Sequence, residues 1–150
     1  MPFDRIPEAV AKGEADAGLL IHEGQLTYGD QRLHCVVDLG KWWKQKTGLP
    51  LPLGGNAVKR SLDPKTQGDV NAIIRDSVQW ALDHRAEALD HALSYGRGLD
   101  RERGDKFVGM YVNGYTMDLG AQGEESLRLL LRQGHEAGII DELVEPEFVG

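Results

Sequence analysis

The amino-acid sequence predicts an α/β fold in which a short parallel or mixed sheet is followed by a helical second half. Three observations predict this fold. An uninterrupted apolar run spans residues 17–21, residues 33–37 form a second run rich in β-branched side chains, and patterns with helical spacing dominate after residue 63. Because few strands alternate with many helices, we interpret the chain as part of a larger α/β protein.

Composition and charge restrict the class of protein. A chain of 150 residues is normally one domain, and 41% hydrophobic with 27% charged residues is typical of a soluble globular protein. The formal net charge of −7 argues against nucleic-acid binding, because no cluster of Lys and Arg is available to neutralise phosphates. No signal peptide and no membrane-spanning stretch is recognisable, so we expect a cytoplasmic protein without a membrane span.

The first elements follow from spacing and from turn residues. Apolar side chains recur with helical spacing over residues 4–12, where Asp4 can cap the start and Gly13 can end the helix. The apolar run 17–21 has the length of a strand buried on both faces. Residues 23–28 are compact enough for one or two helical turns.

The second strand and the helix after it contain the cysteine and two tryptophans. We expect residues 33–37 to form a strand that buries Cys35 as an inert thiol, and a single cysteine excludes an internal disulfide. A short helix is expected at 39–47. Its adjacent Trp42 and Trp43 point in different directions, so only one indole can face the core well.

A proline-rich connector separates the two halves of the chain. Residues 49–56 cannot be helical or a central strand, because each proline fixes its own dihedral angle and extends the residue before it. Two glycines, Gly54 and Gly55, allow the backbone to approach another strand or a ligand closely, and with Asn56 they are candidate substrate-binding residues. A third short strand is expected at 57–59.

The rest of the sequence has helical spacing almost throughout. Asp63 and Pro64 suit the cap and the first residue of a long helix. The expected helices are 64–95, with a break at His84–Arg85 and an end at Gly96, then 100–112 with an end at Gly114, and 124–132. An apolar segment near residues 139–144 resembles a docking tail.

His22 is the candidate catalytic residue. It directly follows the apolar run 17–21, and a ligand of an open α/β sheet binds at the carboxyl ends of its strands. An imidazole titrates near neutral pH, so this position favours a general base, with Glu23 as a neighbour that could orient the ring. The alternative is a core histidine with satisfied ring nitrogens. No metal site is predicted, because His84 and His91 are seven residues apart rather than three or four.

Three stretches of the sequence resemble a known family. They are PFDRIPEAVAKGEADAGLLIHEGQLTY from residue 2, VVDLGKWWKQKTGLPLPLGGNAVKR from residue 36, and FVGMYVN from residue 107 followed by TMDLG. Together they resemble the 1,4-dihydroxy-6-naphthoate synthases of the futalosine route of menaquinone biosynthesis. The resemblance runs from Pro2 to about Asp141 and covers about the C-terminal half of that family.

The resemblance implies a fold and a domain organisation. Members of the family have a periplasmic-binding-protein-like (type II) fold, in which two α/β lobes close on a ligand. Residues 1–52 would then hold second-lobe strands and helices with His22, and residues 53–150 a crossover strand and the C-terminal helices. We therefore expect a single fragment, 1–150, that lacks the N-terminal lobe and much of the ligand cleft.

The resemblance also implies an activity. The family converts cyclic dehypoxanthinyl futalosine to 1,4-dihydroxy-6-naphthoate, a lyase reaction in which a proton is abstracted and the sugar fragment is eliminated. The histidine of the HEGQ motif, His22 here, is the proton acceptor, and no cofactor or metal is required. We expect further substrate contacts from Glu23, Gly54, Gly55 and Asn56.

Three interpretations of the function remain open at this point. The chain could be part of such a synthase, incomplete by itself and completed by a complementary N-terminal half. It could be a non-catalytic domain of the same fold that binds a small carboxylate. It could also be an inactive truncated product that self-associates through an exposed apolar face.

Overall fold

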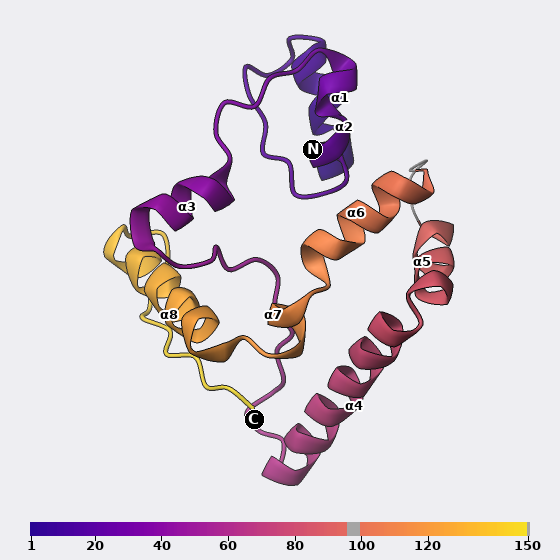
Figure 1. The fold of residues 1–150 in the computed structure, drawn as a ribbon. Helices are drawn as coiled ribbons and strands as arrows, with labels where there is room; N and C mark the ends of the chain where they lie inside the picture. The colour runs from indigo at the N-terminus through magenta and orange to yellow at the C-terminus, as the bar shows by residue number, and fades with distance from the viewer. Residues whose placement is uncertain (96–99, 150) are drawn as a thin grey trace. The chain divides into compact units, whose positions relative to one another are not determined.

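The computed structural model describes residues 1–95 and 100–149, and all the regular secondary structure in these residues is helical (Figure 1). Two short 3-10 helices accompany α-helices of four to twenty residues. The elements are η1 (Phe3–Arg5), α1 (Ile6–Ala11), α2 (Gly24–Thr27), η2 (Tyr28–Gln31), α3 (Leu39–Thr47), α4 (Pro64–Asp83), α5 (Arg85–Ser94), α6 (Arg101–Tyr111), α7 (Gly114–Met117) and α8 (Gly120–Glu136).

The chain divides into two compact units, and each unit is built from two separate stretches of sequence. Unit 1 comprises Met1–Val37 and Arg85–Tyr111. Unit 2 comprises Asp38–His84 and the residues from Val112 onward. His22 therefore shares its unit with α5 and α6, whereas the proline-rich connector belongs to unit 2.

The predicted α/β fold with a parallel or mixed sheet is wrong, and so is the periplasmic-binding-protein-like interpretation. Residues 17–21, 33–37 and 57–59 form no strand in the part of the chain that the structure describes. A strand requires a neighbouring strand to share its backbone hydrogen bonds, and these segments have no such neighbour among the described residues. The apolar run is also not buried, since Leu19 is 59% and Ile21 57% exposed.

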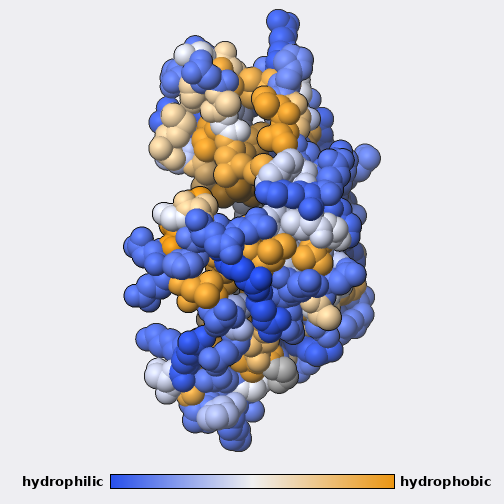
Figure 2. Space-filling view, turned by 90° about the vertical axis from the view of Figure 1, so that its left-hand side faces the viewer, coloured by the Kyte–Doolittle hydropathy of each residue, from blue (hydrophilic) through white to orange (hydrophobic). Residues whose placement is uncertain are grey.

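The buried thiol predicted at Cys35 is also wrong. Cys35 is exposed, and the adjacent Val36 is 89% exposed. Alternating apolar residues bury one face only when a second layer covers that face. Without a sheet, Cys35, Val36 and Val37 stay exposed. Figure 2 shows hydrophobic surface on the face of the molecule that it displays.

Unit 1 is held together by packing between short helices and by charged pairs. Ala9 of α1 and Leu89 of α5 are 4% exposed. Helices α5 and α6 pack against each other, and Arg85 Nε donates to Asp105 Oδ1 at 2.8 Å. Arg103 in α6 also pairs with Asp30 of η2 at 3.0 Å. The Arg103–Asp30 pair connects the two sequence stretches of unit 1, whereas the Arg85–Asp105 pair joins two helices of the second stretch.

Unit 2 contains a buried polar chain around the single inward indole. Trp43 is 2% and Ser126 0% exposed. The Trp43 indole N–H donates to Ser126 Oγ at 2.9 Å, and the Ser126 hydroxyl donates to the Pro50 carbonyl at 2.6 Å. Trp42 is 45% exposed and lies beneath the ammonium group of Lys46. The prediction that only one indole faces the core is confirmed.

The predicted helix boundaries of unit 2 are confirmed where capping residues set them. The Asp63 side chain accepts a hydrogen bond from the Thr66 amide at 3.0 Å, and Pro64 is the first residue of α4. Helix α3 ends at Gly48 with a φ of 76°, a conformation that glycine adopts without strain.

Two further boundary predictions concern the remaining helices. The break between α4 and α5 occurs at His84, as the sequence indicated. The predicted end of α5 at Gly96 lies outside the described residues.

In the described part of the chain, no helix combines the length and the apolar character that crossing a bilayer requires.

Candidate functional site

His22 lies in a tight turn that leads into α2. We call residues 21–25 the histidine turn. The Gln25 amide donates to the His22 carbonyl at 3.0 Å, and the Leu26 amide donates to the Glu23 carbonyl at 2.9 Å. The predicted one or two helical turns after residue 22 are therefore present. The turn directs the His22 side chain inward, where it is only 8% exposed.

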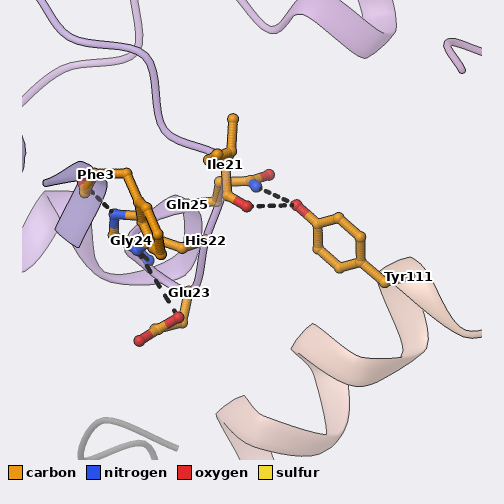
Figure 3. Close-up of polar contacts among 7 residues, drawn as sticks. All are labelled: Phe3, Ile21, His22, Glu23, Gly24, Gln25 and Tyr111. Carbon is orange, nitrogen blue, oxygen red and sulfur yellow. Dashed lines mark hydrogen bonds and ion pairs between the residues drawn. The ribbon is translucent and has the colours of Figure 1, made fainter. Parts of the chain in front are cut away.

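Both ring nitrogens of His22 have backbone partners (Figure 3). Nε2 lies 3.0 Å from the Phe3 carbonyl oxygen, and the Gly24 amide donates to Nδ1 at 2.9 Å. A carbonyl only accepts and an amide N–H only donates, so these partners assign the hydrogen to Nε2 and the lone pair to Nδ1. The ring is thus a neutral imidazole with Nδ1 as its basic nitrogen.

Glu23 lies beside that basic nitrogen. Its Oε2 atom is 3.9 Å from His22 Nδ1, and its side chain is 24% exposed. When Nδ1 gains a proton, the carboxylate forms an ion pair with the ring and stabilises its positive charge. The structure therefore places the Glu23 carboxylate next to the His22 ring, as expected for two neighbouring candidate site residues.

Gly24 and Phe3 shape the space around the imidazole. A Cβ atom on Gly24 would lie 2.5 Å from His22 Cε1 and 3.0 Å from Nδ1, closer than side-chain atoms pack. The Phe3 ring lies 5.4 Å from the imidazole, centroid to centroid, and is tilted against it. Only a glycine at position 24 leaves room for the ring in this orientation.

Tyr111 connects the histidine turn to α6. Its hydroxyl group accepts a hydrogen bond from Gln25 Nε2 at 2.6 Å and donates to the Ile21 carbonyl at 3.3 Å (Figure 3). The spacing of Phe107 and Tyr111 predicts only core packing, and their rings do pack at 4.9 Å. The tyrosine hydroxyl, which needs a partner when half-buried, is the signal that could have indicated this contact.

A pocket of about 370 Å³ lies against the histidine turn within unit 1. Most of its lining is apolar, and His22 and Glu23 contribute ionisable groups to its wall. A mostly apolar pocket with a few convergent polar groups is the usual form of a small-molecule site. It is lined by Phe3, Ile21, His22, Glu23, Ala92, Leu93, Tyr95, Gly104, Phe107 and Val108.

The other candidate substrate-binding residues are placed elsewhere. Gly54, Gly55 and Asn56 lie in unit 2, in an exposed segment without regular secondary structure, and do not line the pocket beside His22. Their role in substrate binding stays a prediction. Across residues 1–95 and 100–149, no three His, Cys, Asp or Glu side chains gather in a way that could hold a metal ion.

A family model described as "Menaquinone biosynthesis" matches residues 1–136 of the chain. The chain belongs to this family. A relative from Thermus thermophilus, named "1,4-dihydroxy-6-naphtoate synthase", is 40% identical over 147 residues, which are 98% of this chain and 54% of the relative. A relative from Streptomyces coelicolor with the same name is 36% identical over 95% of this chain and 51% of its own length.

A solved structure has a similar backbone fold over most of this chain. The X-ray crystal structure of protein AF1704 from Archaeoglobus fulgidus superposes with a TM-score of 0.89 and 46% sequence identity. The match covers 93% of this chain and 53% of that chain. The chain therefore spans about half the length of the relatives that it matches.

Proposed function

We propose that this chain provides the base-containing half of a 1,4-dihydroxy-6-naphthoate synthase, a lyase that converts cyclic dehypoxanthinyl futalosine to 1,4-dihydroxy-6-naphthoate. The observation that carries the proposal is the geometry of His22. Its ring is neutral, its basic nitrogen is identified, and it lies in the wall of an apolar pocket with a carboxylate 3.9 Å away. The names of the two relatives support the same activity.

The proposed chemistry is a proton abstraction coupled to an elimination. Nδ1 of His22 takes a proton from a substrate carbon, and the electron pair of the broken C–H bond forms a new C=C bond. The bond to the sugar-derived leaving group breaks, and the leaving group departs with its bonding pair. The gain in aromatic character drives the step, and the imidazolium afterwards returns its proton to the departing oxygen or to water.

Two residues next to His22 participate in this scheme. The Gly24 amide occupies Nδ1 in the structure, so substrate binding must replace this hydrogen bond before the proton is transferred. Glu23 then stabilises the imidazolium through its carboxylate. No step in this scheme requires a cofactor.

We further propose that the activity needs the remaining half of the synthase length. The chain spans about half of its relatives, and in its described part several apolar side chains remain at the surface in segments without secondary structure. Surface of this kind is typical of an interface with a partner. These side chains belong to Leu19, Ile21, Val36, Val37 and Leu53. Gly54, Gly55 and Asn56 are proposed to contact substrate in the assembled enzyme.

Reconstitution tests the proposal directly. The chain is incubated with cyclic dehypoxanthinyl futalosine, with and without the half of the Thermus thermophilus relative that it does not match, and the absorbance of the naphthoate product is followed. We expect product in the complemented mixture. His22→Ala should lower the rate by a factor of about 100 or more, the usual range for the loss of a general base. His34→Ala, the same change at an exposed histidine, should leave it unaltered.

The outcomes separate the competing functions. Absence of product in the complemented mixture would overturn the synthase proposal, and full activity of His22→Ala would overturn the assignment of the base. Calorimetric binding without turnover would instead favour a non-catalytic domain for small carboxylates. Size-exclusion chromatography addresses self-association, because a monomer that melts cooperatively by itself contradicts the need for a partner.

A further inference from the structure

We propose that Tyr111 is a positioning residue for His22, an inference that rests on the proposed function for its catalytic meaning. The Tyr111 hydroxyl group forms one hydrogen bond before the histidine and one after it. Through these two bonds, α6 holds the turn in the conformation that aligns the imidazole. Tyr111 acts on His22 through the backbone and through Gln25, without contacting the ring itself.

The directions of the two hydrogen bonds match what a hydroxyl group can offer. The oxygen accepts from Gln25 Nε2 at 2.6 Å, and the O–H donates to the Ile21 carbonyl at 3.3 Å. Ile21 immediately precedes His22, and Gln25 is the second residue of α2. The hydroxyl group therefore fixes both ends of the turn to one atom.

The bracketed turn contains the contact that orients the ring. The Gly24 amide, which donates to His22 Nδ1 at 2.9 Å, lies between the two anchored residues. A change in the backbone of the turn changes the direction of this N–H, and with it the hydrogen bond that distinguishes the two ring nitrogens. The Tyr111 hydroxyl thus supports the Gly24 contact, which together with the Phe3 carbonyl places the lone pair on Nδ1.

Helix α6 is itself held in place by several contacts, so it can fix the position of the Tyr111 hydroxyl group. The Tyr111 ring packs against Phe107 one turn earlier in the helix. The same helix is connected to η2 by Arg103 and Asp30 and to α5 by Asp105 and Arg85. Removal of the hydroxyl alone leaves all of these contacts in place, so Tyr111→Phe tests the hydroxyl group separately from the packing of the ring.

Nitrogen NMR on the 150-residue chain tests the inference without any turnover. In the wild type, we expect two well-separated ring ¹⁵N signals for His22, one from a nitrogen that bears hydrogen and one from an acceptor. In Tyr111→Phe, the two signals should move toward each other as the tautomers mix. Hydrogen exchange of the Gly24 amide should become about fivefold faster, as expected for the loss of an ordinary hydrogen bond.

Two further variants make the test decisive. Tyr28→Phe also removes a tyrosine hydroxyl group, but from η2, outside the histidine turn. It should leave the His22 signals unchanged. Gln25→Leu removes the donor to Tyr111, and it replaces Tyr111→Phe in the test if that variant does not fold. Unaltered ring signals and Gly24 exchange in the folded variant would overturn the inference, as would an equal change in Tyr28→Phe.

Activity of the complemented enzyme provides a second readout. A positioning residue should affect the chemical step, so Tyr111→Phe should lower kcat about 5- to 10-fold with KM unchanged. Altered NMR signals in a system where even the wild type forms no product would support the positioning role and overturn the proposed function. Product formation by the wild type together with unaltered NMR signals in Tyr111→Phe would support the proposed function and overturn the positioning role.

Discussion

Substitution of Gly24 by alanine tests the geometry of the histidine turn most directly. The new Cβ atom would lie 2.5 Å from His22 Cε1, whereas ordinary contacts begin at 3.4 Å. The imidazole must therefore retreat by about 0.9 Å, a distance fixed by these two values. A displacement of that size stretches the 2.9 Å hydrogen bond from the Gly24 amide beyond the normal range.

The energetic cost follows from the contacts that are lost. Two hydrogen bonds of the ring, to Gly24 and to Phe3, each contribute about 0.5–1.5 kcal/mol. Overpacking destabilises the folded state by about a further 1–3 kcal/mol. The lower flexibility of alanine in the unfolded chain offsets about 0.4–1 kcal/mol of this loss. We expect Gly24→Ala to lower the free energy of unfolding by about 2 kcal/mol or more.

A matched control separates this clash from the general effect of replacing a glycine. Gly114 is the first residue of the four-residue helix α7, as Gly24 is of the four-residue helix α2. A Cβ atom on Gly114 would meet no atom within 4 Å. Gly114→Ala should therefore raise the free energy of unfolding by about 0.4–1 kcal/mol.

Urea denaturation followed by far-UV circular dichroism measures both variants, and the ¹⁵N signals of His22 report the ring. Gly24→Ala should show a lower midpoint together with displaced ring signals. If Gly24→Ala is as stable as Gly114→Ala and retains the wild-type ring signals, then the contact between the glycine and the imidazole does not exist in solution, and the account of the turn is refuted.

Two further predictions concern unit 2. Ser126→Ala leaves the buried N–H of Trp43 and the carbonyl of Pro50 without their shared partner, so the free energy of unfolding should fall by about 2 kcal/mol; an unchanged urea midpoint would contradict this. Hydrogen bonds from the Thr66 side chain and amide lower the pKa of Asp63 below its usual value. Because the folded-state pKa is the lower one, the cap stabilises α4 fully above about pH 4 and is lost as the pH falls through the depressed value. Circular dichroism of Asp63→Asn, which caps without titrating, should show a weaker acid transition, and identical acid curves would count against the assignment.

The helices were predictable because their boundaries are set by neighbouring residues in the sequence. Asp63 and Pro64 start α4 as a cap and a first helical residue, and Gly48 ends α3 in the left-handed conformation. The break at His84 was likewise indicated by the change in apolar spacing. Each of these signals acts within one helical turn, so no distant part of the chain is needed to interpret it.

The sequence led to a wrong prediction of a sheet, because a β-strand forms only when a second strand, often distant in the sequence, pairs with it. The apolar run 17–21 and the segment 33–37 have the composition of strands, but composition contains no information on whether a second chain segment lies beside them. In the described residues, no neighbouring strand provides the hydrogen bonds. The interpretation of Cys35 failed for the same reason, since its burial depended on the sheet.

The candidate site was predictable only in part. His22 and Glu23 are adjacent in sequence, and an apolar run before a histidine was enough to select them. The partners that orient the ring are distant: the Phe3 carbonyl lies 19 positions away, and Tyr111 bonds to Ile21 across 90 positions. Contacts of this range depend on the tertiary fold of unit 1, which no local pattern specifies.

The distribution of tryptophan between the two units determines which conformational changes intrinsic fluorescence can detect. Trp42, Trp43 and Trp80 are the three tryptophans of the chain, and all of them belong to unit 2. Trp43 is 2% exposed, whereas Trp42 is 45% and Trp80 51% exposed. A collisional quencher such as acrylamide should therefore quench the fluorescence of Trp42 and Trp80 but not that of Trp43. The residual emission is then a reporter of the Trp43 environment alone.

The same distribution leaves unit 1 without an intrinsic indole. Loss of the shielded Trp43 emission registers the opening of unit 2, while a rearrangement of the histidine turn is silent at these wavelengths. Replacement of Phe3 by tryptophan would place a fluorophore against the imidazole, where the native ring centroid is 5.4 Å away. Protonated histidine quenches indole emission, so such a variant would convert the protonation of His22 into an optical signal.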